Sequence, residues 1–133
     1  LISLLIIAGS WRLLRESVEI LLEAAPSHIP LQDVERRMKS VEGVIAEYKL
    51  PWIVKRLGNR SEYWFKPTPP RNGGEAAAAI DHELDRYMHL FVLNRGILMT
   101  PFHNMALISP ETTQADVDHH TKVFREAVKS LFE

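Results

Sequence analysis

The chain has 133 residues, which is enough for one domain or for one small domain with an appendage. Hydrophobic residues make up 46% and charged residues 25%, so the chain can bury a core without disulfides. The net charge of −1 gives no sign of nucleic-acid binding, and the lack of cysteine excludes a disulfide framework, thiolate catalysis and a zinc ribbon.

The first residues are apolar, but the run of residues 1–8 is too short to cross a bilayer, which takes about 18–20 residues. It also lacks the features of a signal peptide. Amphipathic spacing then predicts one long helix over residues 2–25, ended by Pro26 and Pro30. The helix is interpreted as a membrane stub, an interfacial helix, or a helix that packs on the sheet or on another copy. The last interpretation, or a projecting helix, is favoured. The chain begins with Leu1 rather than Met, which suggests a fragment or a processed product.

The middle of the chain changes from helix to strand. Residues 26–30 are predicted to be a linker, and Asp33 is predicted to cap a helix over residues 34–48. Residues 52–57 and 62–65 read as two strands of a hairpin joined through Gly58-Asn59. A loop over residues 66–74 follows, because this segment contains three prolines and two glycines.

The last part predicts a helix over residues 75–94, with Leu84, Met88 and Phe91 facing the core and Gly96 closing it. Short strands are expected at residues 97–99 and 106–108, and a final helix at residues 113–132. The order predicts an α+β fold: a small three- to four-stranded antiparallel or mixed sheet with helices on one face, preceded by the long N-terminal helix.

The loop between the two short strands holds the candidate binding residues, Phe102, His103 and Asn104. They offer an aromatic wall and two hydrogen-bonding groups, although a packed turn with His103 bound to backbone is the competing interpretation.

Two other groups favour ordinary structure. Residues 71–74 have the pattern of an anion site at a helix start, but a plain loop is favoured. His82, Asp85 and His89 share helical spacing, but surface histidines are favoured over a metal site. No catalytic residue and no metal ligand is predicted.

Three segments carry a family resemblance: residues 57–65 (LGNRSEYWF), 67–76 (PTPPRNGGEA) and 93–107 (LNRGILMTPFHNMAL). They resemble the C-terminal subdomain of class III aminotransferases, in the branch of glutamate-1-semialdehyde aminomutases and β-amino-acid transaminases. The resemblance implies pyridoxal phosphate in the parent family and places residues 100–105 at the substrate entrance. It also implies that the cofactor lysine lies on a large domain that precedes this subdomain. No lysine of this chain has such a context, so neither bound cofactor nor activity is expected of the chain alone. The expected partner is that large domain, or another copy.

The head resembles a different family. Residues 3–26, followed by Pro26-Ser27-His28-Ile29, are similar to the last transmembrane helix of cation diffusion facilitators, although the family's zinc ligands are missing at residues 48–51. The chain therefore divides into a head over residues 1–32 and a subdomain over residues 33–133, with a junction within 33–52. Alternatives are the remnant of a membrane cation (zinc) efflux transporter and a small helix-mediated interaction module. The expected location is the cytoplasm, with weak membrane association through residues 1–25 as an option. Whether the chain is an enzyme stays open.

Overall fold

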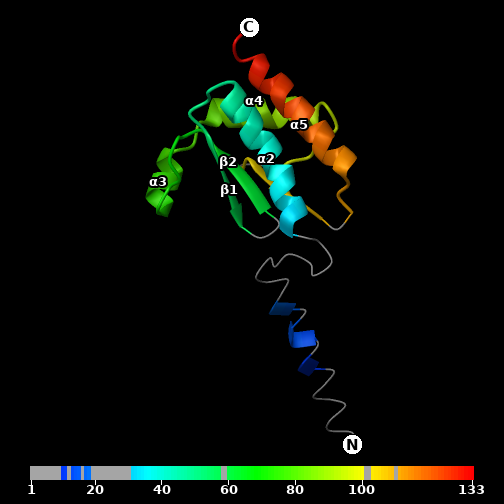
Figure 1. Cartoon of the computed structure of the whole chain (residues 1–133). Helices are drawn as coiled ribbons and strands as arrows, with labels where there is room; N and C mark the ends of the chain where they lie inside the picture. Colours follow the sequence, from blue (N-terminus) through cyan, green and yellow to red (C-terminus); the bar gives the residue numbers. More distant parts are fainter. Residues whose placement is uncertain are drawn as a thin grey trace, which may run out of the picture.

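The computed structural model describes residues 10–11, 13–15, 17–18, 31–57, 60–100, 103–109 and 111–133. Figure 1 shows the helices and strands of this part of the chain, with the C-terminus at one end of the folded unit. Several predicted features lie outside the described residues: most of the helix over residues 2–25, the linker over 26–30, the hairpin turn at Gly58-Asn59, and Phe102.

Helix α2 (Leu31–Glu47) confirms the helix that was predicted over residues 34–48. It begins at Leu31, so Asp33 lies within the helix. The prediction that Asp33 caps this helix is therefore wrong. Its C-terminus is a Schellman motif: Leu50 N donates to Ile45 O at 3.0 Å and Lys49 N donates to Ala46 O at 3.1 Å. Lys49 takes a positive φ of 51° at this turn.

The sheet has three antiparallel strands in the order β1-β2-β3. Strands β1 (Ile53–Leu57) and β2 (Arg60–Trp64) form the predicted hairpin, with Val54 opposite Tyr63. Strand β3 (Met105–Leu107) pairs with β2, with Arg60 opposite Leu107. The strand predicted at residues 97–99 is wrong, because within the described chain this segment pairs with no strand.

Two helices replace the single helix that was predicted over residues 75–94. They are α3 (Gly73–Ala78) and α4 (His82–Leu93). The break has a local cause: the Asp81 side chain accepts a hydrogen bond from Leu84 N at 3.0 Å and so caps a new helix. After α4, Gly96 takes a φ of 81°, which confirms the predicted left-handed residue beyond the helix end.

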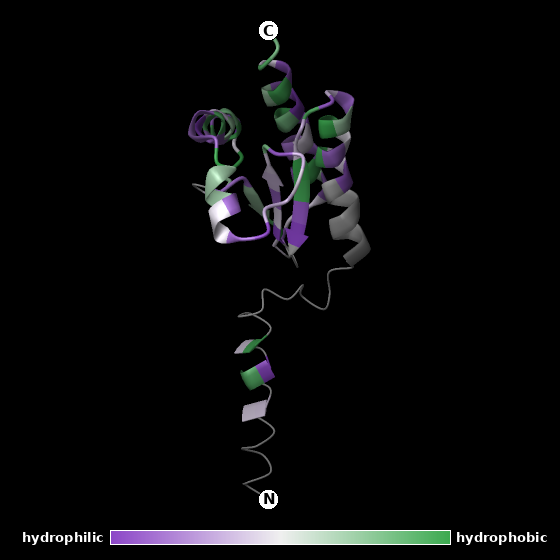
Figure 2. Ribbon diagram, turned by 90° about the vertical axis from the view of Figure 1, so that its left-hand side faces the viewer, coloured by the Kyte–Doolittle hydropathy of each residue, from purple (hydrophilic) through white to green (hydrophobic). Residues whose placement is uncertain are grey.

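Helix α5 (Gln114–Lys129) confirms the predicted C-terminal helix. It begins with a capping box in which the Thr113 and Asp116 side chains each pair with the other residue's backbone N–H. Helices α2 and α5 lie side by side, and α4 also packs against α5 (Figure 1). In the view turned by 90°, the coloured parts of these helices carry both hydrophobic and hydrophilic residues, as amphipathic helices do (Figure 2).

The core lies between these helices and the sheet. Phe124 of α5 is fully buried and meets the rings of Trp52 and Tyr63, with centroid distances of 6.4 Å and 5.1 Å. From α4, the predicted inward residue Met88 is fully buried, whereas Leu84 and Phe91 are only partly buried. Edge-to-face contacts of this kind add to the burial of apolar area.

Within the head, residues 10–11, 13–15 and 17–18 are helical. Trp11 and Leu14, which belong to the predicted apolar stripe, are 68% and 56% exposed. No helix in the described part of the chain is long and apolar enough to cross a membrane.

Candidate functional site

The loop that carries the predicted site residues is held at both ends. On one side, Met99 is buried at 4% exposure. On the other, β3 pairs with β2, and Tyr63 N donates to Asn104 O at 3.1 Å. Within the loop, His103 N donates to Thr100 O at 3.3 Å. These contacts fix the backbone around His103 and Asn104 against the sheet.

Asn104 also joins the loop to helix α4. Its Nδ2 donates to Asp85 Oδ1 at 2.5 Å, and both residues are partly buried. A hydrogen bond to a carboxylate is stronger than one between neutral groups. The Asn104 side chain is therefore oriented by a residue 19 positions earlier in the chain.

His103 takes a more open position. Its Nδ1 lies 3.6 Å from Glu62 Oε1 of β2, and its side chain is 60% exposed. The contact is an ion pair only when His103 is protonated. The imidazole of His103 thus lies beside a carboxylate of the sheet.

The loop and helix α4 together enclose a cavity of about 370 Å³. The candidate binding residues His103 and Asn104 line it. Its other lining residues were not among the predicted site residues: Ile80, His82, Asp85, Arg86, His89 and Thr100.

Of these residues, His82, Asp85 and His89 were noted for their spacing, and Arg86 was missed. Helical spacing could have identified Arg86, because it lies four residues after His82, on the same face of α4. Among the described residues, no group of three or more His, Asp or Glu side chains is arranged to hold a metal ion.

The charges around the cavity are mixed. Arg86 is exposed and positive, whereas Asp85 is partly buried and accepts from Asn104. Burial raises the pKa of the neighbouring Tyr63 hydroxyl far above its usual range, and the negative charge of Asp85 raises it further. Tyr63 thus stays protonated. The arrangement suits recognition of a small polar molecule, with Arg86 and the histidines as donors to a carboxylate.

Residues 71–74, for which a plain loop was favoured over an anion site, form an ordinary helix start. Asn72 Oδ1 accepts from Glu75 N at 2.9 Å, and the Arg71 guanidinium binds the Glu75 carboxylate at 2.8 Å. The hydrogen bonds from Arg71 lower the pKa of Glu75. Because the Arg71 guanidinium is engaged by Glu75, its charge is already balanced by a carboxylate.

A covalently held pyridoxal phosphate does not fit the residues of this chain. Such a cofactor needs a lysine enclosed in a pocket with a partner for its ring nitrogen. All six lysines of the chain are exposed: Lys39, Lys49, Lys55, Lys66, Lys122 and Lys129.

Comparison with known proteins places this architecture among aminotransferases. No family model matches the chain, and no curated protein matches it. A solved glutamate-1-semialdehyde aminomutase from Pseudomonas aeruginosa PAO1 matches 75% of this chain with 43% identity and a TM-score of 0.72. A variant of that enzyme, solved in complex with PMP, matches equally well. The chain spans only 22% of the aminomutase's length.

Two further solved structures share the fold. A β-phenylalanine aminotransferase from Variovorax paradoxus matches 74% of this chain and 23% of its own, with 18% identity and a TM-score of 0.67. An omega-transaminase from Sphaerobacter thermophilus matches 75% of this chain and 23% of its own, with 17% identity and a TM-score of 0.64. These neighbours support the aminotransferase resemblance of the sequence. They give no support to the cation-efflux resemblance of the head.

Proposed function

We propose that residues 33–133 form the C-terminal subdomain of a pyridoxal-phosphate-dependent aminotransferase or aminomutase. The observation that carries this proposal is the 43% identity, at a TM-score of 0.72, to an aminomutase over 75% of the chain. The chain's share of that enzyme, 22%, is the size of a subdomain and not of a whole catalytic unit.

In this proposal the partner of the chain is a large domain that carries the cofactor. Pyridoxal phosphate held there would act as the electron sink for amino-group transfer. This chain would supply the wall of the substrate entrance. Asn104, oriented by Asp85, and Arg86 would position a substrate carboxylate, and His103 would close the outer rim beside Glu62.

The chain alone should therefore neither bind pyridoxal phosphate covalently nor transaminate. Absorbance spectroscopy of the full chain mixed with the cofactor checks the first point, followed by borohydride reduction and peptide mapping. A band that is lost on reduction and maps to a single lysine would contradict this part of the proposal.

A complementation experiment tests the subdomain assignment itself. The aminomutase from Pseudomonas aeruginosa is shortened by the part that matches this chain, and its activity is measured with and without the added full chain. We expect activity to return when the full chain is added, and to fall again when the chain carries Arg86→Ala. The matched control is Arg125→Ala, because Arg125 is also exposed but lies on α5 and pairs with Glu47. Failure of the unmodified chain to bind the shortened enzyme would overturn the assignment.

A further inference from the structure

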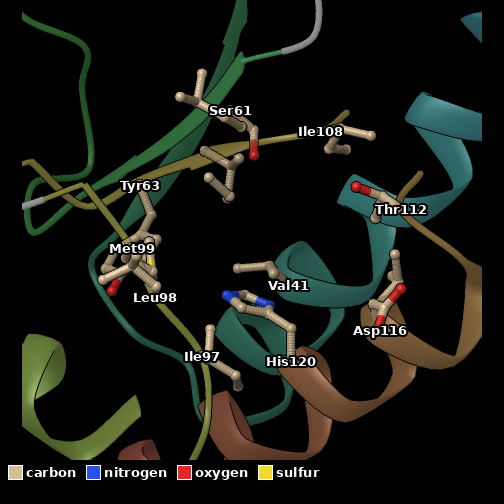
Figure 3. Close-up of a pocket in the computed structure, with 14 residues that line it drawn as sticks. Val41, Ser61, Tyr63, Ile97, Leu98, Met99, Ile108, Thr112, Asp116 and His120 are labelled. Carbon is tan, nitrogen blue, oxygen red and sulfur yellow. The ribbon is translucent and has the colours of Figure 1, made fainter. Parts of the chain in front are cut away.

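A second cavity, of about 180 Å³, lies between the sheet, helices α2 and α5, and the segment at residues 97–99. Figure 3 shows it with Val41 of α2, His120 of α5 and Ile97 on one side, and Ser61 and Tyr63 of β2 across from them. It is separate from the cavity beside Asn104. The walls are mainly aliphatic, as in a pocket for an apolar molecule.

Two polar atoms of the cavity's lining residues lack a partner. The Tyr63 hydroxyl and His120 Nε2 are both shielded from solvent, and neither has a hydrogen-bond partner in the described chain. Buried polar groups are nearly always hydrogen-bonded, and leaving one without a partner costs free energy. An occupant of the cavity that offers a hydrogen bond to His120 Nε2 would remove this cost at His120. In Figure 3 the ring nitrogens of His120 face the open space.

The size of the cavity limits the occupant. An engineered cavity of about 150 Å³ with purely apolar walls takes up benzene and stays free of water. A cavity of about 180 Å³ therefore has room for one six-membered ring with a small substituent.

The charges select a neutral molecule. Asp116 lines the cavity, so an anion would meet a carboxylate. Burial, together with the nearby His119, lowers the pKa of His120, so its imidazole is neutral near pH 7 and does not offset an anionic ligand. A neutral imidazole nitrogen can accept or donate, and a hydroxyl group can serve it in either case.

We propose that this cavity is a binding site for a neutral, phenol-sized molecule whose hydroxyl group hydrogen-bonds to His120 Nε2 while its ring packs against Val41 and Ile97. The site is independent of the proposed aminotransferase role, because it shares no residue with the cavity beside Asn104.

The test uses the full chain with phenol and with toluene, which has the same ring without the hydroxyl. Binding is measured by titration, and its location by the NMR shifts of the Val41 and Val117 methyl groups. We expect phenol to bind at one saturable site about fivefold more tightly than toluene, which is the contribution of one neutral hydrogen bond.

Two histidine variants separate the polar contact from the apolar one. His120→Leu should bring the ratio of the two affinities close to one while toluene still binds. The matched control is His119→Leu, because His119 is the neighbouring residue of α5 but is exposed, with its Nε2 against Arg95 O at 2.8 Å. This control should keep the preference for phenol.

Several results would overturn the proposal: no saturable binding, equal affinity for both molecules, or an unchanged ratio in His120→Leu. If His120→Leu does not fold, the methyl shifts of the unmodified chain decide, because phenol must perturb Val41 and Val117. Displacement of phenol by the shortened aminomutase would show that the cavity is a domain interface and would also overturn the proposed binding site.

Discussion

At the scale of single residues, Asn104 links the candidate loop to helix α4 through its bond to Asp85. Asn104→Ala should lower the free energy of unfolding by about 1.5–3 kcal/mol, because a partly buried carboxylate loses its donor. Urea unfolding measures this change. The double variant with Asp85→Ala should recover part of the loss, since the carboxylate is then absent as well. Fully additive losses would show that the two side chains do not act as a pair.

His120 should make the stability of the fold depend on pH. Its pKa lies below the ordinary value of 6.5 in the folded chain, chiefly because of burial and also because of His119. As the pH falls through about 6.5, the unfolded chain takes up the proton first, so the free energy of unfolding decreases. The decrease ends once the pH is below the pKa that His120 has in the folded chain.

Urea unfolding of the full chain and of His120→Gln, from about pH 8 to about pH 5, isolates this effect. The difference between the two proteins should change with pH, because glutamine does not titrate. His119 and Asp116 face the same region from α5 and are present in both proteins. A constant difference across the range would contradict a lowered pKa for His120.

At the scale of elements, helix α4 contributes to the core through Met88 and Val92, which are both fully buried. Met88→Ala should cost about 2–5 kcal/mol of unfolding free energy, because a large side chain is removed from a closely packed site. Leu84 is only partly buried, so Leu84→Ala should cost clearly less. Thermal or urea unfolding of both variants gives the comparison. A larger cost at Leu84 would mean that α4 turns a different face to the core.

The elements that were predicted from the sequence are those with local signals. The hairpin was predicted by two β-rich runs around Gly58-Asn59, and α5 by its apolar spacing after Thr113. The break before α4 was missed because four alanines mask it, although Asp81 is an ordinary capping residue. The segment at residues 97–99 was misjudged because strand formation needs a partner, which local sequence does not specify.

In the candidate site, too, some residues were predicted from local sequence and others were not. His103 and Asn104 were recognised because polar residues in a short loop between apolar runs stand out. Their partners could not be recognised from the sequence. The bond from Asn104 to Asp85 and the contact of His103 with Glu62 depend on how β3 pairs with β2 and on how α4 packs against the loop. Arg86 is different, because it lies four residues after His82 on the same face of α4, and this helical spacing could have identified it.

At the scale of the whole molecule, the division between the head and the subdomain remains a prediction. Four described head residues are exposed apolar side chains: Trp11, Leu13, Leu14 and Val18. Among the residues that the structure describes, the fully buried core extends from Val44 to Val128. We therefore expect residues 1–30 to be dispensable for folding, and we propose that they promote self-association or weak membrane binding.

A shortened chain that begins at Leu31 should unfold cooperatively, with the same midpoint in urea as the full chain, and should sediment as a monomer. The full chain should associate with itself in a way that detergent reverses, because its exposed apolar residues would otherwise face water. Leu13→Ser with Leu14→Ser in the full chain is the matched variant, since both leucines are more than half exposed at 66% and 56%. It should be monomeric and as stable as the full chain. If instead the shortened chain is unfolded while the full chain is a stable monomer, the head packs into the core and the proposed boundary is mistaken.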